Sequence, residues 1–435
     1  MAARSQMAMS LAFHIIFAVI GVALPLMMIV AEAQWLRTGE RVYRVLARRW
    51  AKGAAILFAV GAVSGTVLSF ELGLLWPGFM KFAGSIIGMP FSLEGFAFFT
   101  EAIFLGIYLY GWDRISPRAH WLAGLMVAVS GAASGWLVVL ANAWMNTPVG
   151  FTMVDGHVTD VDPIRAMASP AGLAEALHMT LASYAATGLL AAGVHAYWLL
   201  RDKADAFHRR GLAIALAVGG VAAVLQPISG DYAAKVVAKT QVAKLAAMEG
   251  QFQTGRRAPL RIGGIPDVKA GATRFAIEIP AVLSWMAYGD ANAEVVGLND
   301  IRPEDRPDVR VVHPAFQIMV GCGMAMMGVS LWGAWLAWRR RRVPDARWFL
   351  RAVFLTSPMG MVAIEAGWTV TEVGRQPWVI QGILRTSEAV TPVGGLWGSM
   401  LAYTGLYLFL GAVVVRLLLA QFRAGPSAEE MEAGS

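Results

Sequence analysis

Five side chains able to bind a metal lie inside apolar stretches of this sequence. They are two histidines, two glutamates and a methionine: His14, Glu94, His178, Met319 and Glu365. An ionisable group at membrane depth costs roughly 2.5–3.5 kcal/mol, so it usually faces the protein interior and has a function. Imidazole and thioether groups are ligands of haem iron, and a His/Met pair raises the reduction potential. The set therefore predicts a buried redox site, with the carboxylates as further ligands.

Each candidate also has a simpler interpretation. A lone membrane histidine can bridge two helices by hydrogen bonds, and Met319 lies in a methionine-rich stretch where methionine usually packs. No HExxH, HxxEH or cysteine cluster indicates zinc. The single cysteine, Cys322, excludes a disulfide framework, an iron–sulfur cluster and c-type haem attachment.

The composition indicates a membrane protein, because 57% of the 435 residues are hydrophobic and only 15% are charged. A helix needs about 20 apolar residues to cross a bilayer. Nine stretches meet this length, at residues 8–33, 52–75, 91–111, 121–144, 173–200, 210–229, 313–338, 347–370 and 397–421. The first is too long for a cleaved secretory signal, so we expect a retained helix.

Basic residues gather in alternate connections between the stretches. They follow the first, third, fifth and seventh stretches: Arg37, Arg41, Arg44, Arg48, Arg49, Arg114, Arg118, Arg201, Lys203, Arg209, Arg210 and Arg339 to Arg342. This bias predicts an N-terminus outside and a C-terminus inside. It accounts for the net charge of +7 without a nucleic-acid partner. With this orientation all five candidate ligands fall in the outer half of the membrane.

The expected architecture is an all-α integral membrane protein with about nine transmembrane helices. Residues 1–229 and 313–421 carry the helices and the candidate ligands, and residues 422–435 form a disordered cytoplasmic tail. A long external loop, residues 230–312, joins helices six and seven and contains a short helix near 241–249. Long ordered loops are often functional, although a passive surface excursion is the alternative.

Glu94 and Glu101 are seven residues apart, which places both on one face of a helix. Glu101 is about 10 Å deeper in the membrane. Ser134 in the fourth stretch is another polar group at mid-membrane depth. These residues predict a proton path from the inside towards the ligand layer. The alternative is a structural carboxylate, with a serine bonded to its own helix.

Several short runs carry a family resemblance through their order and spacing. They are residues 13–14, 92–101, 111–114, 141–145, 244–249, 264–267, 275–280, 364–368 and 374–378. Together they resemble subunit I of the cytochrome bd-type quinol oxidases along essentially the whole chain.

The resemblance implies three haems. His178 and Met319 correspond to the ligands of a low-spin haem b. His14, Glu94 and Glu365 correspond to ligands of two high-spin haems, one a haem b and the other a haem d or a further haem b. Which glutamate serves which haem is left open.

The resemblance also implies roles for residues near the long loop. Lys244 and Glu249 match quinol-site positions, and Arg375 and Trp378 match contacts to haem propionates or quinol. Glu101 matches the proton-channel residue, with Ser134 as its partner.

The implied activity is a quinol:dioxygen oxidoreductase. It would oxidise quinol at the outer face of the bacterial cytoplasmic (inner) membrane, reduce O2 to water, and generate a proton gradient without pumping. Family members imply an oxidase subunit II and small accessory membrane subunits, among membrane lipids. Two alternatives stay open: a multihaem quinol electron carrier that does not react with oxygen, and a proton-coupled transporter. Transporters often contain paired broken helices from repeated halves, and no repeat is visible.

Three features depart from the common family pattern. Gln317 stands where an arginine is frequent, Met361 stands where a tryptophan is expected, and the interval from Glu94 to Glu101 is one residue shorter than in some members. Together with the short loop, these features resemble the cyanide-insensitive branch, in which the third haem can be b rather than d.

Overall fold

The computed structural model describes residues 1–202, 205–426 and 430. Within this part of the chain, nine spans are long and apolar enough to cross a membrane, as the sequence predicts. They are built from α1 (Ala2–Thr38), α2 (Arg41–Leu75), α3 (Pro77–Tyr110), α4 (Pro117–Asn146), α6 (Gly172–Arg201), α7 (Ala206–Thr240), α10 (Val309–Arg340), α11 (Arg347–Thr356) with α12 (Met359–Arg375), and α14 (Trp397–Ala424).

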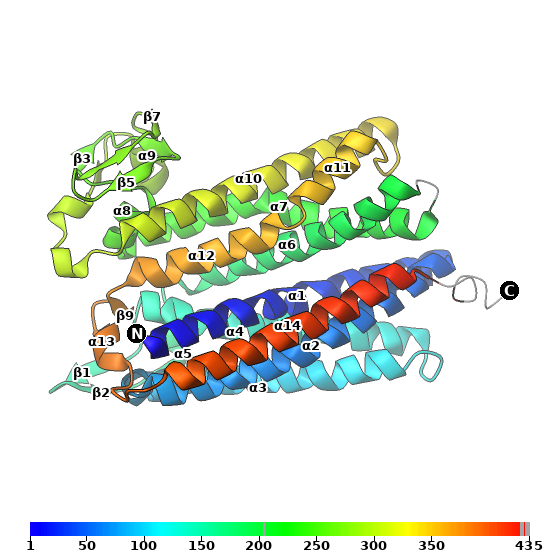
Figure 1. Cartoon of the computed structure of the whole chain (residues 1–435), viewed down its shortest axis with the longest axis horizontal. Coiled ribbons are helices and arrows are strands. Elements are labelled where there is room, and N and C mark those ends of the chain that lie inside the picture. The colour runs from blue at the N-terminus through cyan, green and yellow to red at the C-terminus, as the bar shows by residue number, and fades with distance from the viewer. Residues whose placement is uncertain (203–204, 427–429, 431–435) are drawn as a thin grey trace.

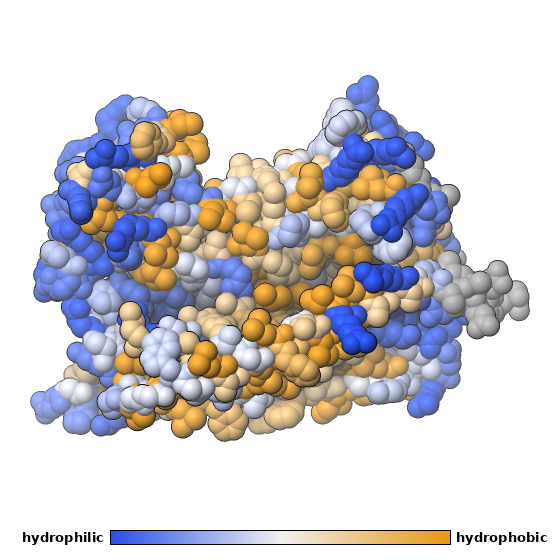
Figure 2. All heavy atoms as spheres, in the orientation of Figure 1, coloured by the Kyte–Doolittle hydropathy of each residue, from blue (hydrophilic) through white to orange (hydrophobic). Residues whose placement is uncertain are grey.

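The long helices run side by side along the longest axis of the molecule (Figure 1). The N-terminus lies at one end of the bundle, and α14 finishes at the other end. The strands and the short helices of the connections gather at the end that holds the N-terminus, which we call the loop end. Figure 2 shows hydrophilic residues at both ends and hydrophobic residues along the middle, as expected for a membrane-spanning bundle.

The segment between α7 and α10 is ordered by small antiparallel pairs: β3 with β8, β4 with β7 and β5 with β6. Its elements are α8 (Val242–Met248), β3 (Gly255–Arg256), β4 (Leu260–Ile262), β5 (Ile265–Asp267), β6 (Ala272–Arg274), β7 (Ile277–Ile279), α9 (Val282–Tyr288), β8 (Glu294–Val295), η1 (Leu298–Asp300) and η2 (Pro303–Asp305). The predicted short helix is confirmed as α8. Met248 and Phe252 pack with Val309 and Val312 of α10, so the segment is anchored on the bundle.

Two shorter connections at the loop end also contain structure. The first holds β1 (Thr152–Val154), β2 (His157–Thr159) and α5 (Pro163–Met167), and the second holds β9 (Trp378–Ile380), β10 (Leu384–Arg385) and α13 (Thr386–Ala389). At the chain end, α14 continues through Ala424. Most of the predicted disordered tail, residues 427–429 and 431–435, lies outside the described residues.

Helix α7 extends beyond the predicted end at residue 229 and finishes at Thr240. An ion pair one turn apart, Lys235 Nζ to Asp231 Oδ2 at 2.5 Å, supports this extension. Hydropathy detects the apolar part of a helix and misses polar turns that continue it, so the external loop begins later than predicted.

Four helices form a closed group that contains two candidate ligands, His178 on α6 and Met319 on α10. α6 contacts α7, α7 contacts α10, α10 contacts α12, and α12 contacts α6. This order places α6 and α10 on one diagonal of the group.

Candidate functional site

His178 of α6 is held in one tautomer by side chains of α7. Its Nδ1 atom lies 3.0 Å from Ser229 Oγ, and Ser229 Oγ donates to the Gln226 carbonyl at 2.9 Å. Because the serine hydrogen points to the Gln226 carbonyl, the Nδ1 atom carries a hydrogen and donates it in a hydrogen bond to the serine oxygen. The Nε2 atom is then unprotonated, and the Gln226 amide nitrogen lies 3.2 Å from Nε2 and 3.3 Å from Nδ1. An imidazole in this form binds a metal through Nε2.

His14 of α1 is held in the same way by α2. Its Nδ1 atom lies 3.0 Å from Ser64 Oγ, and Ser64 Oγ donates to the Val60 carbonyl at 2.9 Å. The Nε2 atom of His14 is therefore also the unprotonated nitrogen. In both cases a serine of the neighbouring helix accepts a hydrogen bond from Nδ1 of the histidine, although the two helix pairs are different.

A glycine follows the serine in both cases and brings the neighbouring helix close to the ring. A Cβ atom at Gly65 would lie 3.0 Å from His14 Cε1, and one at Gly230 would lie 3.4 Å from His178 Cε1. These serines and glycines were not predicted as site residues from the sequence. Their only signal in the sequence is a Ser-Gly pair inside an apolar helix.

Met319 of α10 lies against α12, where a Cβ atom at Gly367 would come within 3.0 Å of Met319 Sδ. His178 and Met319 thus stand on the diagonal helices of the four-helix group, and each touches a glycine of a flanking helix.

Glu365 lies on α12 beside α1. Its neighbour Ile364 packs with Ile15, the residue after His14, so the two candidate ligands come from helices in contact at this level. The Oε1 atom of Glu365 is buried without a hydrogen-bond partner among the described residues. Glu94 on α3 accepts a hydrogen bond from Ser134 Oγ of α4 at 2.9 Å.

These donors fit haem. Across the described residues, no three His, Cys, Asp or Glu side chains are grouped to hold a bare metal ion. Haem iron takes only one or two protein ligands, because the porphyrin supplies the others. Two imidazoles with an unprotonated Nε2, a thioether and a carboxylate with an unpartnered buried oxygen supply that donor set.

Ser134 pairs with Glu94 and not with Glu101, which corrects the expected partnership. α3 and α4 are antiparallel, so a residue later in α4 faces a residue earlier in α3. Glu101 instead faces Gly131, where a Cβ atom would lie 3.1 Å from Glu101 Oε1. The carboxylate of Glu101 is buried at the α3–α4 contact. It lies about two helical turns further from the loop end than Glu94.

A further buried cluster continues this face of α3. Tyr108 lies seven residues after Glu101, and its carbonyl is 2.9 Å from His120 Nε2. The other nitrogen of His120, Nδ1, is 2.8 Å from Glu32 Oε1 on α1. The Glu32 Oε2 and Tyr108 Oη atoms have no hydrogen-bond partner among the described residues. This cluster was not predicted from the sequence, because its members come from three different helices.

Lys244 of α8 is a buried cation in a network with Arg375. Lys244 Nζ donates to Asn146 Oδ1 at 2.9 Å, and Arg375 Nη1 donates to the same oxygen at 3.2 Å. Asn146 Nδ2 in turn donates to Glu175 Oε1 at 2.8 Å. Burial lowers the pKa of Lys244 to about 7, and the negative charge of Glu175 opposes that change. The structure thus brings two predicted site residues, Lys244 and Arg375, together.

Glu249 is the C-cap residue that follows α8 and is 5% exposed, and its Oε2 atom lacks a hydrogen-bond partner in the described part of the chain. Burial raises the pKa of Glu249 to about 7, and the positive charge of Arg261 opposes the rise. Lys244 and Glu249 therefore belong to separate polar clusters at the two ends of one short helix.

Trp378 of β9 lies under the guanidinium group of Arg385, whose Cζ atom is 4.5 Å from the ring centre. Arg385 also donates to Asp305 Oδ1 at 2.6 Å. Trp378 thus joins η2 and β10 rather than the cluster of Lys244 and Arg375.

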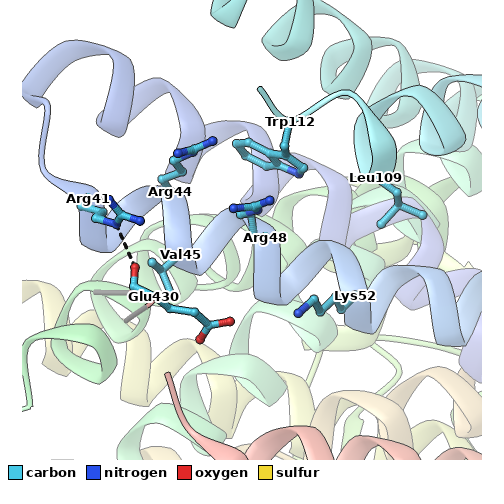
Figure 3. A pocket seen from close by; sticks show the side chains of 8 residues that line it. All are labelled: Arg41, Arg44, Val45, Arg48, Lys52, Leu109, Trp112 and Glu430. Carbon is cyan, nitrogen blue, oxygen red and sulfur yellow. Dashed lines mark hydrogen bonds between the residues drawn. The ribbon is translucent and has the colours of Figure 1, made fainter. Parts of the chain in front are cut away.

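A basic cavity of about 270 Å³ lies at the end of the bundle opposite the loop end. Figure 3 shows that its lining residues are Arg41, Arg44, Val45, Arg48, Lys52, Leu109, Trp112 and Glu430. Arg41 Nε donates to the Glu430 carbonyl at 2.8 Å (Figure 3). None of the predicted site residues lines this cavity.

A family profile described as cytochrome bd terminal oxidase subunit I matches residues 2–426. The chain belongs to this family. As a member of the bd oxidase subunit I family, it is a haem-containing quinol oxidase subunit and a multi-pass membrane protein.

Relatives of known description match almost the full length. A Bacillus subtilis (strain 168) protein provisionally described as cytochrome bd menaquinol oxidase subunit I is 38% identical over 99% of this chain and 98% of its own. The cytochrome bd ubiquinol oxidase subunit 1 of the same strain is 31% identical over 97% and 93%. The bd oxidase structure from Geobacillus thermodenitrificans shares 37% identity and a TM-score of 0.91, over 98% of both chains.

Proposed function

We propose that this chain oxidises quinol at the loop end, reduces O2 to water, and separates charge without a pumping device. The observation that carries the proposal is the pair of serine-held histidines, each of which presents an unprotonated Nε2 inside a membrane-spanning bundle. Two buried titratable residues of the external loop, Lys244 in α8 and Glu249 directly after it, supply the groups that a quinol site needs.

His178 and Met319 would hold a low-spin haem b, and His14, Glu94 and Glu365 would hold two high-spin haems, b with d or a further b. When bound, these groups supply one-electron transfer and the reduction of O2 to water. The protein supplies the axial ligands, their tautomers and a dry interior.

Glu249 accepts a proton from quinol as the quinol gives up its electrons. Its buried carboxyl has a pKa of about 7, so it takes and releases protons near neutral pH. Lys244, whose pKa is also about 7, orients the quinol ring by donating a hydrogen bond to a ring oxygen. Each quinol gives up two protons and two electrons, so two quinols supply the four electrons that one O2 requires and release four protons at the loop end, while four other protons are taken up to form water.

The protons for water enter from the end opposite the loop. Glu101 and Glu94 lie on one face of α3, and Ser134 bonds to Glu94 at 2.9 Å. These groups pass protons towards the ligand layer, while Glu249 releases quinol protons at the loop end. Uptake and release on opposite sides generate a proton gradient.

We place the protein in the bacterial cytoplasmic membrane with the loop end outside. The basic runs of α2 and of the α10–α11 connection lie at the opposite end, which supports this orientation. An oxidase subunit II and small accessory subunits are the proposed partners. Exposed aromatic residues on α3, Phe96 and Phe99, supply an apolar face for a membrane partner or lipid.

Oxygen consumption by the purified oxidase with two electron donors tests the proposal. Glu249→Gln should slow the reaction with quinol and leave the reaction with an artificial electron donor nearly intact. Equal loss with both donors would contradict the quinol role of Glu249. Haem that never reacts with O2 would favour an electron carrier, and absence of haem would favour a transporter.

A further inference from the structure

Two side chains of α10, one helical turn apart, bind the backbone of the external loop. His313 Nδ1 lies 2.7 Å from the Met248 carbonyl, and His313 Nε2 lies 3.0 Å from the Gly263 carbonyl. Gln317 Oε1 accepts from the Gly263 N–H at 2.9 Å, and Gln317 Nε2 donates to the Arg261 carbonyl at 3.1 Å. Residues four apart share a helix face, so both side chains act on one surface of the loop.

The two side chains together hold two separate parts of the loop. Met248 ends α8, and its carbonyl is one of those that a helix end leaves without an internal partner. Gly263 follows β4, and both its N–H and its carbonyl are held. Its φ of +67°, in the left-handed region, favours glycine at this point. α10 thus joins the end of α8 to the end of β4.

His313 is completely buried, and both of its ring nitrogens face carbonyl oxygens. Each ring nitrogen is within hydrogen-bond distance of one loop carbonyl, so the one ring links both parts of the loop to α10. Replacing His313 would leave the Met248 and Gly263 carbonyls without these donors.

The strand held by Gln317, β4, carries Arg261, whose charge acts on the buried carboxyl group of Glu249. Arg261 Nε donates to Glu278 Oε1 at 2.9 Å, and Arg261 Nη1 donates to Gln251, two residues after Glu249. Arg261 is the charge that opposes the rise in the pKa of Glu249. The hydrogen bond from the Gln317 side chain to the Arg261 carbonyl therefore helps to fix the Arg261 guanidinium group near the buried Glu249 carboxyl.

We propose that His313 and Gln317 form a clamp that positions the external loop for quinol oxidation. The clamp keeps Arg261 beside Glu249 and joins the loop to the helix that carries Met319. His313 and Gln317 are positioning residues, since they act through Arg261 and Met248. This inference rests on the proposed role of Glu249 as the proton acceptor from quinol.

The test compares Gln317→Met and His313→Ala with Glu249→Gln in the purified holoenzyme. Gln317→Met keeps the side-chain length and removes both amide hydrogen bonds. Val311→Ala, an exposed position on the same helix outside the clamp, is the matched control. The measurements are KM and kcat with quinol, the rate with an artificial donor, the pH profile with quinol, and the rate of loop cleavage by a protease.

Both clamp variants should raise the quinol KM about tenfold, a factor in line with the loss of one or two hydrogen bonds. They should move the acidic limb of the quinol pH profile to higher pH, because Arg261 no longer stabilises the ionised Glu249. Loop cleavage should accelerate, and the artificial-donor rate and the low-spin spectrum should match those of Val311→Ala.

An unchanged KM and pH limb in Gln317→Met, with Glu249→Gln impaired, would overturn the clamp. Equal loss with both donors would also overturn it, because the variants would then act on the haem ligands. If Glu249→Gln itself leaves quinol oxidation intact, the proposed role of Glu249 fails instead. In that case faster loop cleavage in the clamp variants would still support the conclusion that His313 and Gln317 hold the external loop on α10.

Discussion

Ser229 Oγ lies 3.0 Å from His178 Nδ1 and donates its own hydrogen to its helix, so the serine fixes which nitrogen of His178 is unprotonated. Orienting partners of this kind matter for ligand affinity, because they set the tautomer and basicity of an imidazole ligand. The relationship yields a direct prediction about the low-spin haem.

Ser229→Ala removes the hydroxyl oxygen that accepts the hydrogen bond from His178 Nδ1–H. We expect weaker haem binding at His178, by about tenfold or more, because loss of an outer-shell partner of a ligating histidine has this scale of effect. Titration of haem-depleted protein with haem b, followed by the low-spin spectrum, measures it. Ser330→Ala is the control, since the Ser330 hydroxyl donates to the Met326 carbonyl of its own helix at 2.7 Å. Equal behaviour of the two variants would contradict the assignment.

Ser64→Ala should act on the other histidine. Because Ser64 holds His14 Nδ1 at 3.0 Å, its loss should reduce the high-spin haem signal and O2 reduction while the low-spin spectrum persists. Difference spectra with and without carbon monoxide separate the two signals. A change confined to the low-spin signal would show that His14 does not serve the oxygen site.

Gly131→Ala should obstruct proton uptake. The added methyl group would lie 3.1 Å from Glu101 Oε1, tight enough to displace the carboxylate. We expect O2 consumption to fall about tenfold, less than the roughly 100-fold or greater loss expected when a proton-transfer group is removed, because the carboxylate is shifted and not deleted. Gly106→Ala on α3 is the control, because nothing lies within 4 Å of its added atom. Normal turnover in Gly131→Ala would exclude Glu101 as a required proton carrier.

The rate of quinol oxidation should depend on pH through two groups near the loop. Glu249, with a pKa of about 7, accepts a proton only when ionised, so kcat/KM should fall as the pH drops below about 7. Lys244, also with a pKa of about 7, loses its positive charge as the pH rises, so kcat/KM should fall again on the alkaline side. Glu249→Gln should remove the acidic limb and keep the alkaline limb. A profile identical to that of the unchanged protein would contradict the role of Glu249.

The number of spans and the identity of the ligand candidates were accessible from the sequence, because hydropathy and buried ionisable residues are local signals. Helix ends were less accessible: α7 continues to Thr240 through a polar turn that hydropathy does not detect. The strands of the external loop are only two or three residues long, too short to show an alternating pattern.

Relationships between distant residues were the least accessible. Ser64 and Ser229 acquire their role only when a neighbouring helix brings a histidine to them. Ser134 was expected beside Glu101, and the antiparallel packing of α3 and α4 places it on Glu94. His313 and Gln317 bind backbone atoms of the loop, so the residue types of their partners leave no pattern to find.

The haem content of the purified chain and its ligand variants tests the central claim most directly. Pyridine haemochrome spectra should show haem in the unchanged protein, and His178→Ala and Met319→Ala should each lose the low-spin signal while remaining in the membrane. Haem-free protein, or a low-spin spectrum that survives both substitutions, would contradict the account.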